Sequence, residues 1–327
     1  MLDRPQVIMA GQNLYPTVPE RAPVAVLKEH LDSVDFLRIN EDIGSPQLVS
    51  VAHDCTVKFW DLTTHHLLKS VAAHTEAIYC CDCSGPLLCT CSPDKSVLLW
   101  DFRTQAQVGS AQAHTAKVYF VRFTGTEEVV TCGRDGKLLL WDTRNLRSPK
   151  GDYSVHPDHI YRSVDVSADR SLLAAVTQNS QIEVFDFHSR RLLDEVTLAW
   201  DLSVFPEDAD FLTPPSTIYC VRFLNQTKEL LTAHQDMAVR KLGVAPSLHE
   251  EATLRNHYDY IRHVEVAADD SLFFSTCQDG SVRRWEGFQA VRSYTGASQI
   301  MSCAALTRDK RVLATSCWDQ CVYLYQA

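Results

Sequence analysis

A pattern of fourteen residues recurs seven times along the chain, and this repetition constrains the fold more than any other feature. Each copy places an acid or amide six positions before the residue that ends a short apolar run. The pairs are Asp54/Trp60, Asp94/Trp100, Asp135/Trp141, Asn179/Phe185, Asp236/Leu242, Asp279/Trp285 and Asp319/Tyr325. Successive copies lie 40, 41, 44, 57, 43 and 40 residues apart, and a four-stranded propeller blade takes about 40–45 residues.

The segment GRDGKLLLWDTR, residues 133–144, shows what one copy predicts. Asp135-Gly136 is a dipeptide typical of a tight turn between two antiparallel strands. Residues 138–141 are apolar throughout, so a strand at this place must be covered on both faces. Neighbouring sheets in a ring would provide that cover.

Another short strand precedes each hairpin, often behind a histidine, as in AHTEAIYCCDC and AHTAKVYFVRF. From this His to the terminal Trp-Asp, the chain resembles the WD-repeat β-propeller family across residues 23–327. The resemblance implies an all-β, seven-bladed propeller. The seventh copy runs out before an outer strand, so we expect VAVL, residues 24–27, to supply that strand and close the ring. Residues 1–22 form an N-terminal extension that either lies along the propeller or stands away from it.

In the WD-repeat family a buried network links the His, a Ser or Thr on the second strand, the turn Asp and the Trp. The resemblance implies complete sets in four blades, with structural rather than catalytic roles. They are His30, Ser50, Asp54, Trp60; His74, Thr90, Asp94, Trp100; His114, Thr131, Asp135, Trp141; and His257, Ser275, Asp279, Trp285.

The other three blades depart from this pattern. Blade four keeps His156 but has Ala175, Asn179 and Phe185, while blades five and seven lack the His. A buried polar network stabilises only when every member is paired. We therefore expect these three blades to depend more on apolar packing.

Composition excludes several classes of partner. The chain has 31 basic and 41 acidic residues and a net charge of −10, which argues against a general nucleic-acid or anionic-membrane surface. No secretory signal and no run of about 18 apolar residues is evident. We expect a cytoplasmic or nuclear protein.

Twelve cysteines raise the question of metal. The densest cluster is Cys80, Cys81, Cys83, Cys89 and Cys91, whose spacing differs from the paired C-x₂₋₄-C knuckles of structural zinc sites. We expect reduced, buried thiols, with no metal and no cofactor. No P-loop, dinucleotide fingerprint, G-x-S-x-G or H-E-x-x-H motif is present, so we expect a protein that is not an enzyme.

The start of each innermost strand should line the top mouth of the propeller. The residues directly after the first β-branched position are Asp35, Tyr79, Tyr119, Tyr161, Tyr219, Arg262 and Met301. Tyr has high β-propensity and suits a packed strand, but its apolar body and polar tip also suit an interface. Equivalent positions in peptide-binding members of the family face the mouth, so we predict a partner-binding rim here.

Residues just before the turn acids should face the same side, among them Arg134 and Trp318. Trp318 either anchors a partner side chain or packs against its neighbour. The long interval between copies four and five contains an acidic and aromatic insert, residues 198–216. This insert is a lid, an element that binds a basic partner, or a partly ordered loop.

Two adjacent blades end in Trp-Asp-x-Arg, at residues 100–103 and 141–144. This resembles the double box of propellers that serve as substrate receptors of cullin-RING ubiquitin ligases, where Arg103 and Arg144 would contact the adaptor. The alternative is a surface Arg paired within its own blade. The sequence therefore predicts a scaffold that binds protein or peptide segments on its top face within a larger complex, with a ligase receptor as the alternative.

Overall fold

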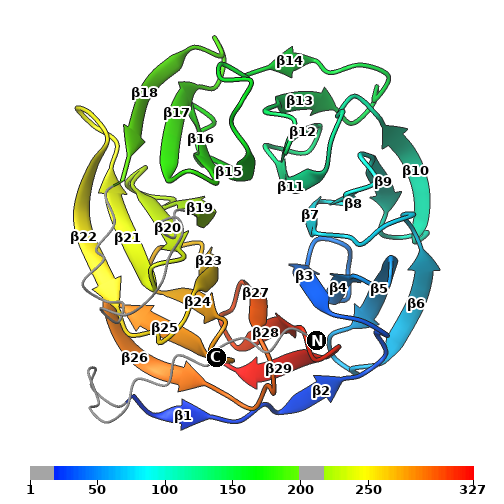
Figure 1. Ribbon diagram of the computed structural model, residues 1–327. Coiled ribbons are helices and arrows are strands. Elements are labelled where there is room, and N and C mark those ends of the chain that lie inside the picture. Colours follow the sequence, from blue (N-terminus) through cyan, green and yellow to red (C-terminus); the bar gives the residue numbers. More distant parts are fainter. Residues whose placement is uncertain (1–17, 199–216) are drawn as a thin grey trace, which may run out of the picture.

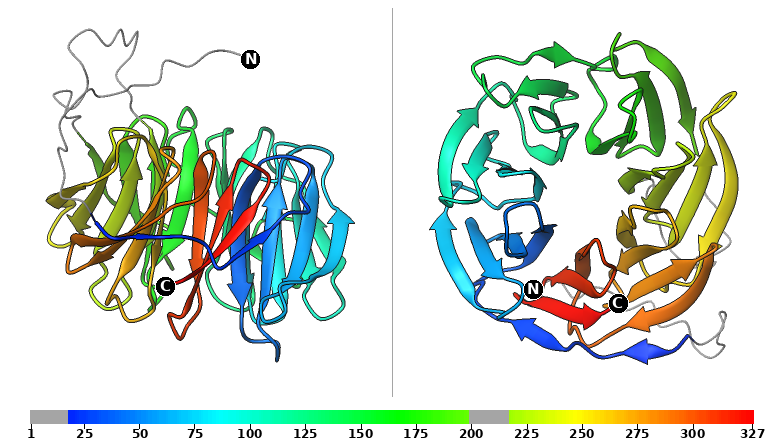
Figure 2. Two further views of the ribbon diagram at one scale, coloured as in Figure 1. Left: turned by 90° about the horizontal axis from the view of Figure 1, so that it is seen from below. Right: turned by 180° about the vertical axis from the view of Figure 1, so that it is seen from behind.

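The computed structural model describes residues 18–198 and 217–327, and every regular element in them is a β-strand. Seven sheets, antiparallel except for one added outer strand, stand around a central channel as the blades of a propeller (Figure 1). Viewed from the side, the blades form a disc (Figure 2). The described residues contain no helix long and apolar enough to cross a membrane.

Each blade begins with its innermost strand at the channel and continues outward strand by strand. Blades one to three are β3 (Val34–Asn40), β4 (Gln47–Ala52), β5 (Thr56–Asp61), β6 (Leu67–Ala72); β7 (Cys80–Ser84), β8 (Leu87–Cys91), β9 (Val97–Asp101), β10 (Ala106–Ala111); and β11 (Val118–Phe123), β12 (Glu128–Gly133), β13 (Leu138–Asp142), β14 (Gly151–Asp152). Blades four and five are β15 (Tyr161–Val166), β16 (Leu172–Thr177), β17 (Gln181–Asp186), β18 (Leu192–Thr197); and β19 (Ile218–Phe223), β20 (Leu230–His234), β21 (Ala238–Gly243), β22 (His249–Arg255). Blades six and seven are β23 (Ile261–Val266), β24 (Phe273–Cys277), β25 (Val282–Glu286), β26 (Gln289–Tyr294), β1 (Glu20–Arg21); and β27 (Met301–Leu306), β28 (Val312–Cys317), β29 (Val322–Gln326), β2 (Ala25–Leu27).

The start of the chain closes the ring, as the sequence predicted. Strand β2 pairs antiparallel with β29 and becomes the outer strand of blade seven. Just before it, β1 pairs in parallel with β26 and adds a fifth strand to blade six. The last residues of the N-terminal extension therefore lie along the outside of the propeller (Figure 1). Strand β2 thus covers the edge of β29, which would otherwise be free to pair with another chain.

Strand β13 shows why apolar runs form the third strand of a blade. Residues Leu138 to Trp141 are all at most 4% exposed, because adjacent blades cover both faces. The turn before it needs a glycine. Gly136 has φ of +69°, and a Cβ atom there would lie 2.4 Å from the Pro157 carbonyl oxygen.

Three of the four predicted buried networks are complete, and the fourth, in blade six, is present in part. In blade three, His114 lies 3.0 Å from Asp135 and 2.8 Å from Thr131 Oγ1, and Trp141 Nε1 donates to that hydroxyl at 2.9 Å. Blades one and two repeat these contacts at 2.7–3.1 Å. Blade six keeps the two hydroxyl contacts at 2.6 and 2.8 Å, with a longer His257–Asp279 separation of 3.6 Å.

Blades four, five and seven lack the usual network, and each pairs polar side chains in another way; that they depend more on apolar packing stays a prediction. In blade five, the fully buried Asp236 accepts a hydrogen bond from Arg240 Nη1 at 2.9 Å. In blade seven, the Tyr323 hydroxyl donates to Asp319 at 2.6 Å. In blade four, the Tyr161 hydroxyl donates to the buried Glu183 at 2.7 Å. Each blade pairs its polar side chains differently, since a buried charge must find a partner.

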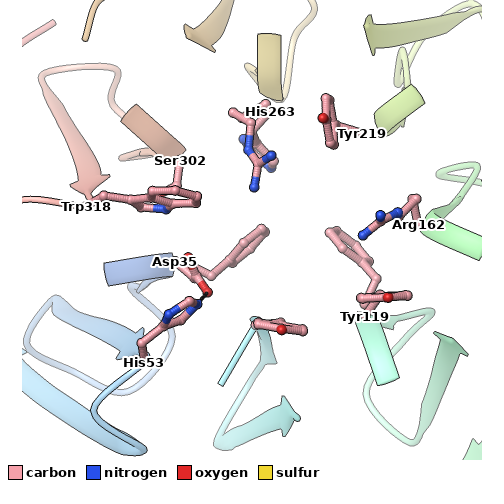
Figure 3. Close-up of a pocket in the computed structure, with 12 residues that line it drawn as sticks. Asp35, His53, Tyr119, Arg162, Tyr219, His263, Ser302 and Trp318 are labelled. Atoms are coloured by element: carbon pink, nitrogen blue, oxygen red, sulfur yellow. Dashed lines mark ion pairs between the residues drawn. The ribbon is translucent and has the colours of Figure 1, made fainter. Parts of the chain in front are cut away.

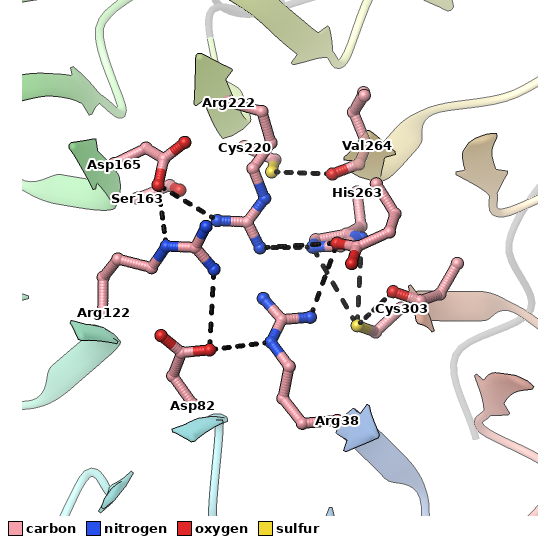
Figure 4. Close-up of polar contacts among 12 residues, drawn as sticks. Arg38, Asp82, Arg122, Ser163, Asp165, Cys220, Arg222, His263, Val264 and Cys303 are labelled. Atoms are coloured by element: carbon pink, nitrogen blue, oxygen red, sulfur yellow. Dashed lines mark hydrogen bonds and ion pairs between the residues drawn. The ribbon is translucent and has the colours of Figure 1, made fainter. Parts of the chain in front are cut away.

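A ring of six alternating charges fills the channel, one from each of blades one to six (Figure 4). Its members are Arg38, Asp82, Arg122, Asp165, Arg222 and Glu265. Neighbours lie 2.9, 3.5, 2.7, 3.8 and 3.8 Å apart in that order, and Arg38 lies 3.6 Å from Glu265 to complete the circle. Blade seven contributes the buried Ala305 at this level.

Asp82 shows how the ring is stabilised. Burial raises the pKa of Asp82, but the neighbouring guanidinium groups and the Phe123 backbone N–H together outweigh burial and lower that pKa overall. Its second carboxylate oxygen accepts the backbone N–H of Phe123 in the next blade at 2.8 Å. The ring thus links adjacent blades through both charge and backbone.

Candidate binding site at the channel mouth

A bulge at the same place in six innermost strands positions the mouth residues. Pairing with the second strand shifts right after the first residue of the innermost strand, so that one residue is skipped. In blade two the equivalent residue immediately precedes β7. A β-bulge re-aims the side chain of the extra residue, and these seven side chains surround the mouth. They are Asp35, Tyr79, Tyr119, Arg162, Tyr219, Arg262 and Ser302.

The prediction that Tyr161 and Met301 line the mouth was wrong. Both side chains are fully buried, and Arg162 and Ser302 occupy the mouth positions instead. The cause is an Ile immediately before each of these two strands, which has the β-branched side chain expected of the first strand residue. A shift of one residue turns a strand side chain to the opposite face. In these two blades the sequence pattern therefore selects a residue one position too early.

The mouth opens into a cavity of about 310 Å³ (Figure 3). Besides the seven mouth residues, its lining comprises Phe36, His53, Phe120, His263 and Trp318. Phe36 packs edge-on against both Phe120 and His263, with ring centroids 5.6 and 5.2 Å apart. These three side chains follow the mouth residues directly on their strands. The cavity is thus lined by aromatic rings at this depth and carries the charged side chains at its entrance.

Aromatic rings form a continuous wall along one side of the cavity. Tyr79 and Tyr119 stack with centroids 5.9 Å apart and planes 12° apart. His53 lies 5.9 Å from Tyr79 and 6.4 Å from Trp318. The wall therefore joins blades one, two, three and seven. Trp318, singled out in the sequence as a turn residue, is part of it, whereas Arg134 is exposed and does not line the cavity.

Two guanidinium groups lie over aromatic faces of the mouth. The Arg162 group lies 4.4 Å from the centre of the Tyr119 ring. The Arg262 group lies 4.5 Å from the Tyr219 ring and 5.5 Å from that of Trp318. Cation–π contacts of this kind hold a planar cation in place, so less side-chain entropy is lost when it binds a ligand. Both groups are therefore oriented in advance.

An ion pair completes the mouth. His53 Nε2 lies 2.7 Å from Asp35 Oδ2, and the hydrogen bond to Asp35 raises the pKa of His53 despite partial burial. The two arginines are not neutralised by this pair. The mouth is therefore cationic in a chain whose net charge is −10.

The hydroxyl at the mouth is held by its surroundings. Ser302 Oγ donates to the Val34 carbonyl at 2.7 Å and lies 2.9 Å from Ser316 Oγ. His53 is paired with Asp35 rather than with this hydroxyl. The arrangement suits non-covalent binding of a ligand with aromatic contacts and an anionic group.

The remaining predicted sites lie away from the cavity lining. Arg103 and Arg144 are both exposed. Arg144 pairs with Asp142 at 2.8 Å and with Glu127 at 3.0 Å. Except for Leu198, the insert at 198–216 lies outside the described residues. The cysteines are free, and most are buried in the sheets.

The fold and the repeated networks define a protein of the WD-repeat class. The family model "WD domain, G-beta repeat" matches residues 21–61, 65–101, 105–142, 249–286 and 288–326. The chain belongs to this family, whose members generally act as scaffolds or adaptors for protein interactions and are typically not enzymes. The matches leave out residues 143–248, where blades four and five have lost the usual network.

Several curated relatives resemble the chain over part of their length. "WD repeat-containing protein 37" of Xenopus tropicalis is 32% identical over 184 residues, which cover 54% of this chain and 35% of the relative. The protein of the same name from Mus musculus is 31% identical over 197 residues, covering 58% and 38%. "Small ribosomal subunit protein RACK1z" of Arabidopsis thaliana is 29% identical over 119 residues, covering 34% of each. The chain thus spans little more than a third of these relatives.

Proposed function

We propose that this protein is a non-enzymatic scaffold whose channel mouth binds a protein segment carrying an anionic side chain. The observation that carries the proposal is the pair Arg162 and Arg262, each held over an aromatic ring at the entrance of the cavity. The guanidinium fork matches carboxylate and phosphate groups bidentately. Tyr, Trp and Arg are also the residues that dominate binding energy at protein interfaces.

The experiment is a fluorescence-polarisation screen of the purified chain against peptides in three matched versions. One version carries Glu, one carries phosphoserine and one carries neutral Gln at the same positions. We expect the anionic versions to bind and the Gln version to bind at least about tenfold more weakly, because a charged hydrogen bond contributes about 1.5–3 kcal/mol. The Glu and phosphoserine versions distinguish the two sources of negative charge.

The double variant Arg162→Gln, Arg262→Gln tests the site itself. We expect it to lose at least about tenfold in affinity for the peptide selected by the screen. Arg144→Gln is the matched control, because Arg144 is exposed but lies outside the cavity lining. Unchanged affinity of the double variant, or equal binding of the Gln peptide, would contradict the proposal.

A ligase receptor is the alternative carried by Arg103 and Arg144. Both side chains are exposed, but the pairing of Arg144 with Asp142 and Glu127 favours the ordinary interpretation of a surface Arg. Co-purification of a cullin adaptor with the wild type, abolished by Arg103→Ala with Arg144→Ala, would support this alternative. In either case we propose that the protein works as a subunit of a larger complex in the cytoplasm or nucleus.

A further inference from the structure

The top of blade four holds two histidines and two glutamates in mutual contact. His156 and His159 lie in the loop before β15, and their ring centroids are 4.4 Å apart. His156 Nε2 lies 3.0 Å from Glu195 Oε2 on β18. His159 Nδ1 lies 2.7 Å from Glu183 Oε1 on β17. The cluster therefore joins one loop to two strands.

This cluster exists because blade four has lost the usual network. Ala175 has no hydroxyl, Phe185 has no side-chain N–H group, and Asn179 is exposed. The side chain of His156 is consequently 40% exposed and turns to Glu195, whereas the equivalent His114 of blade three has a fully buried side chain. His156 is thus available for another purpose.

The buried carboxylate of Glu183 is the second notable feature. Glu183 is fully buried, and burying a charge is costly unless it is paired. Its oxygens contact His159 Nδ1 at 2.7 Å and the Tyr161 hydroxyl at 2.7 Å. The other blades have apolar residues in place of Tyr161, namely Val34, Ile78, Val118, Ile218, Ile261 and Met301. Blade four therefore carries a hydroxyl that orients this carboxylate.

The ligand atoms are close enough to share one ion. One atom each from His156, His159 and Glu183 lie within 4.8 Å of one another. Imidazole nitrogen and carboxylate oxygen are ordinary zinc ligands, at about 2.0–2.2 Å from the metal in a tetrahedral arrangement. Among the described residues, the other group of this kind, His257 with Cys277 and Asp279, includes two members of the blade six network.

We propose that His156, His159 and Glu183 bind one Zn²⁺ ion, with Glu195 orienting His156. A carboxylate bonded to a ligating histidine is a recurrent outer partner at zinc sites, and the Glu195–His156 contact fits that role. The ion would also neutralise the buried charge of Glu183. It would join the loop before β15 to the third strand of blade four, one of the blades that lack the usual network.

The test uses tag-free protein freed of metal by a chelator and titrated with ZnCl₂ by isothermal calorimetry. We expect one Zn²⁺ per chain in the wild type, and His156→Ala to weaken binding by at least about tenfold. The His156 side chain is 40% exposed, so this variant should fold. His249→Ala is the matched control, because His249 is 48% exposed and lies 3.8 Å from Glu251 but belongs to no such cluster among the described residues.

Two further measurements separate a metal site from a merely structural cluster. Tyr161→Phe keeps all three ligands but removes the hydrogen bond to Glu183, and it should weaken Zn²⁺ binding by about tenfold. Zn²⁺ should raise the thermal unfolding midpoint of the wild type but not of His156→Ala. The proposal would be overturned if the wild type binds no Zn²⁺, or if the His156→Ala variant binds Zn²⁺ as tightly as the wild type does.

Discussion

Blades three and four have the same four-strand topology but treat their polar residues in opposite ways. In blade three, His114, Thr131, Asp135 and Trp141 satisfy one another inside the protein. In blade four, the equivalent histidine faces outward to a glutamate. Both blades nevertheless pair their first three strands without interruption after the bulge.

The comparison teaches that the usual network is not what makes a blade. Apolar residues packed between sheets do that, and one buried cluster runs through blades one to four. The network instead decides whether polar side chains have hydrogen-bonding capacity left for a ligand. Blade three has used its capacity internally, whereas blade four keeps part of it at the surface.

The largest expected difference between the two blades comes from the turn residue. Asp135→Ala in blade three removes a carboxylate that contacts His114 and the backbone N–H of Thr115. We expect a loss of about 3 kcal/mol in the free energy of unfolding, because a buried pair is broken. Asn179 in blade four is exposed, so Asn179→Ala should change the free energy of unfolding by less than about 0.5 kcal/mol. Urea denaturation of both variants measures this, and equal losses would break the comparison.

A smaller effect should follow when blade four receives the hydroxyl that blade three uses. Ala175→Thr places a polar group at a fully buried position, where neither His156 nor Phe185 offers it a hydrogen bond. We expect a loss of about 1–2 kcal/mol, since an unpaired buried hydroxyl pays its desolvation cost. Stabilisation of the Thr variant in urea would show that blade four still contains partners for a network.

The smallest effect is the pH dependence of the blade three network. Burial raises the pKa of Asp135, but the contacts with His114 and the backbone N–H groups of Thr115 and Lys137 together outweigh burial and lower that pKa below its ordinary value. The stabilisation is therefore fully present above the unfolded-state pKa of about 3.9 and is lost as the pH falls through the lower folded-state pKa. The stability gap between wild type and Asp135→Asn should narrow on acidification below about pH 4. A gap that widens would contradict this sign.

The repeat was sufficient to predict the seven blades, the closing strand β2 and the residues of the four networks, three of which are complete. These follow from local patterns that repeat in register. Five of the seven mouth residues were also predicted correctly by position. Tyr161 and Met301 failed because a bulge shifts the strand by one residue, and an Ile before each strand hides that shift.

Other features depend on contacts between blades, which a single repeat does not display. In blades one to six, the charged residue of the ring is the fifth residue of the innermost strand, counted from the residue before the bulge. Arg122 of blade three and Asp165 of blade four therefore occupy equivalent positions. That regularity becomes visible in the sequence only when the innermost strands are aligned by their bulges. The pairing of His159 with Glu183 could not be predicted, because neither residue belongs to the repeated pattern and the contact joins a loop to a strand 24 positions away.

The ring of alternating charges is constrained by the odd number of blades around the channel. An odd number of positions cannot alternate two signs around a circle without placing like charges side by side, so in a propeller of seven blades one position must be neutral. In this protein that position is Ala305, in the blade built from both ends of the chain. The last sheet to be completed therefore buries no charge of its own at this level, and its small side chain leaves Arg38 and Glu265 room to meet across it.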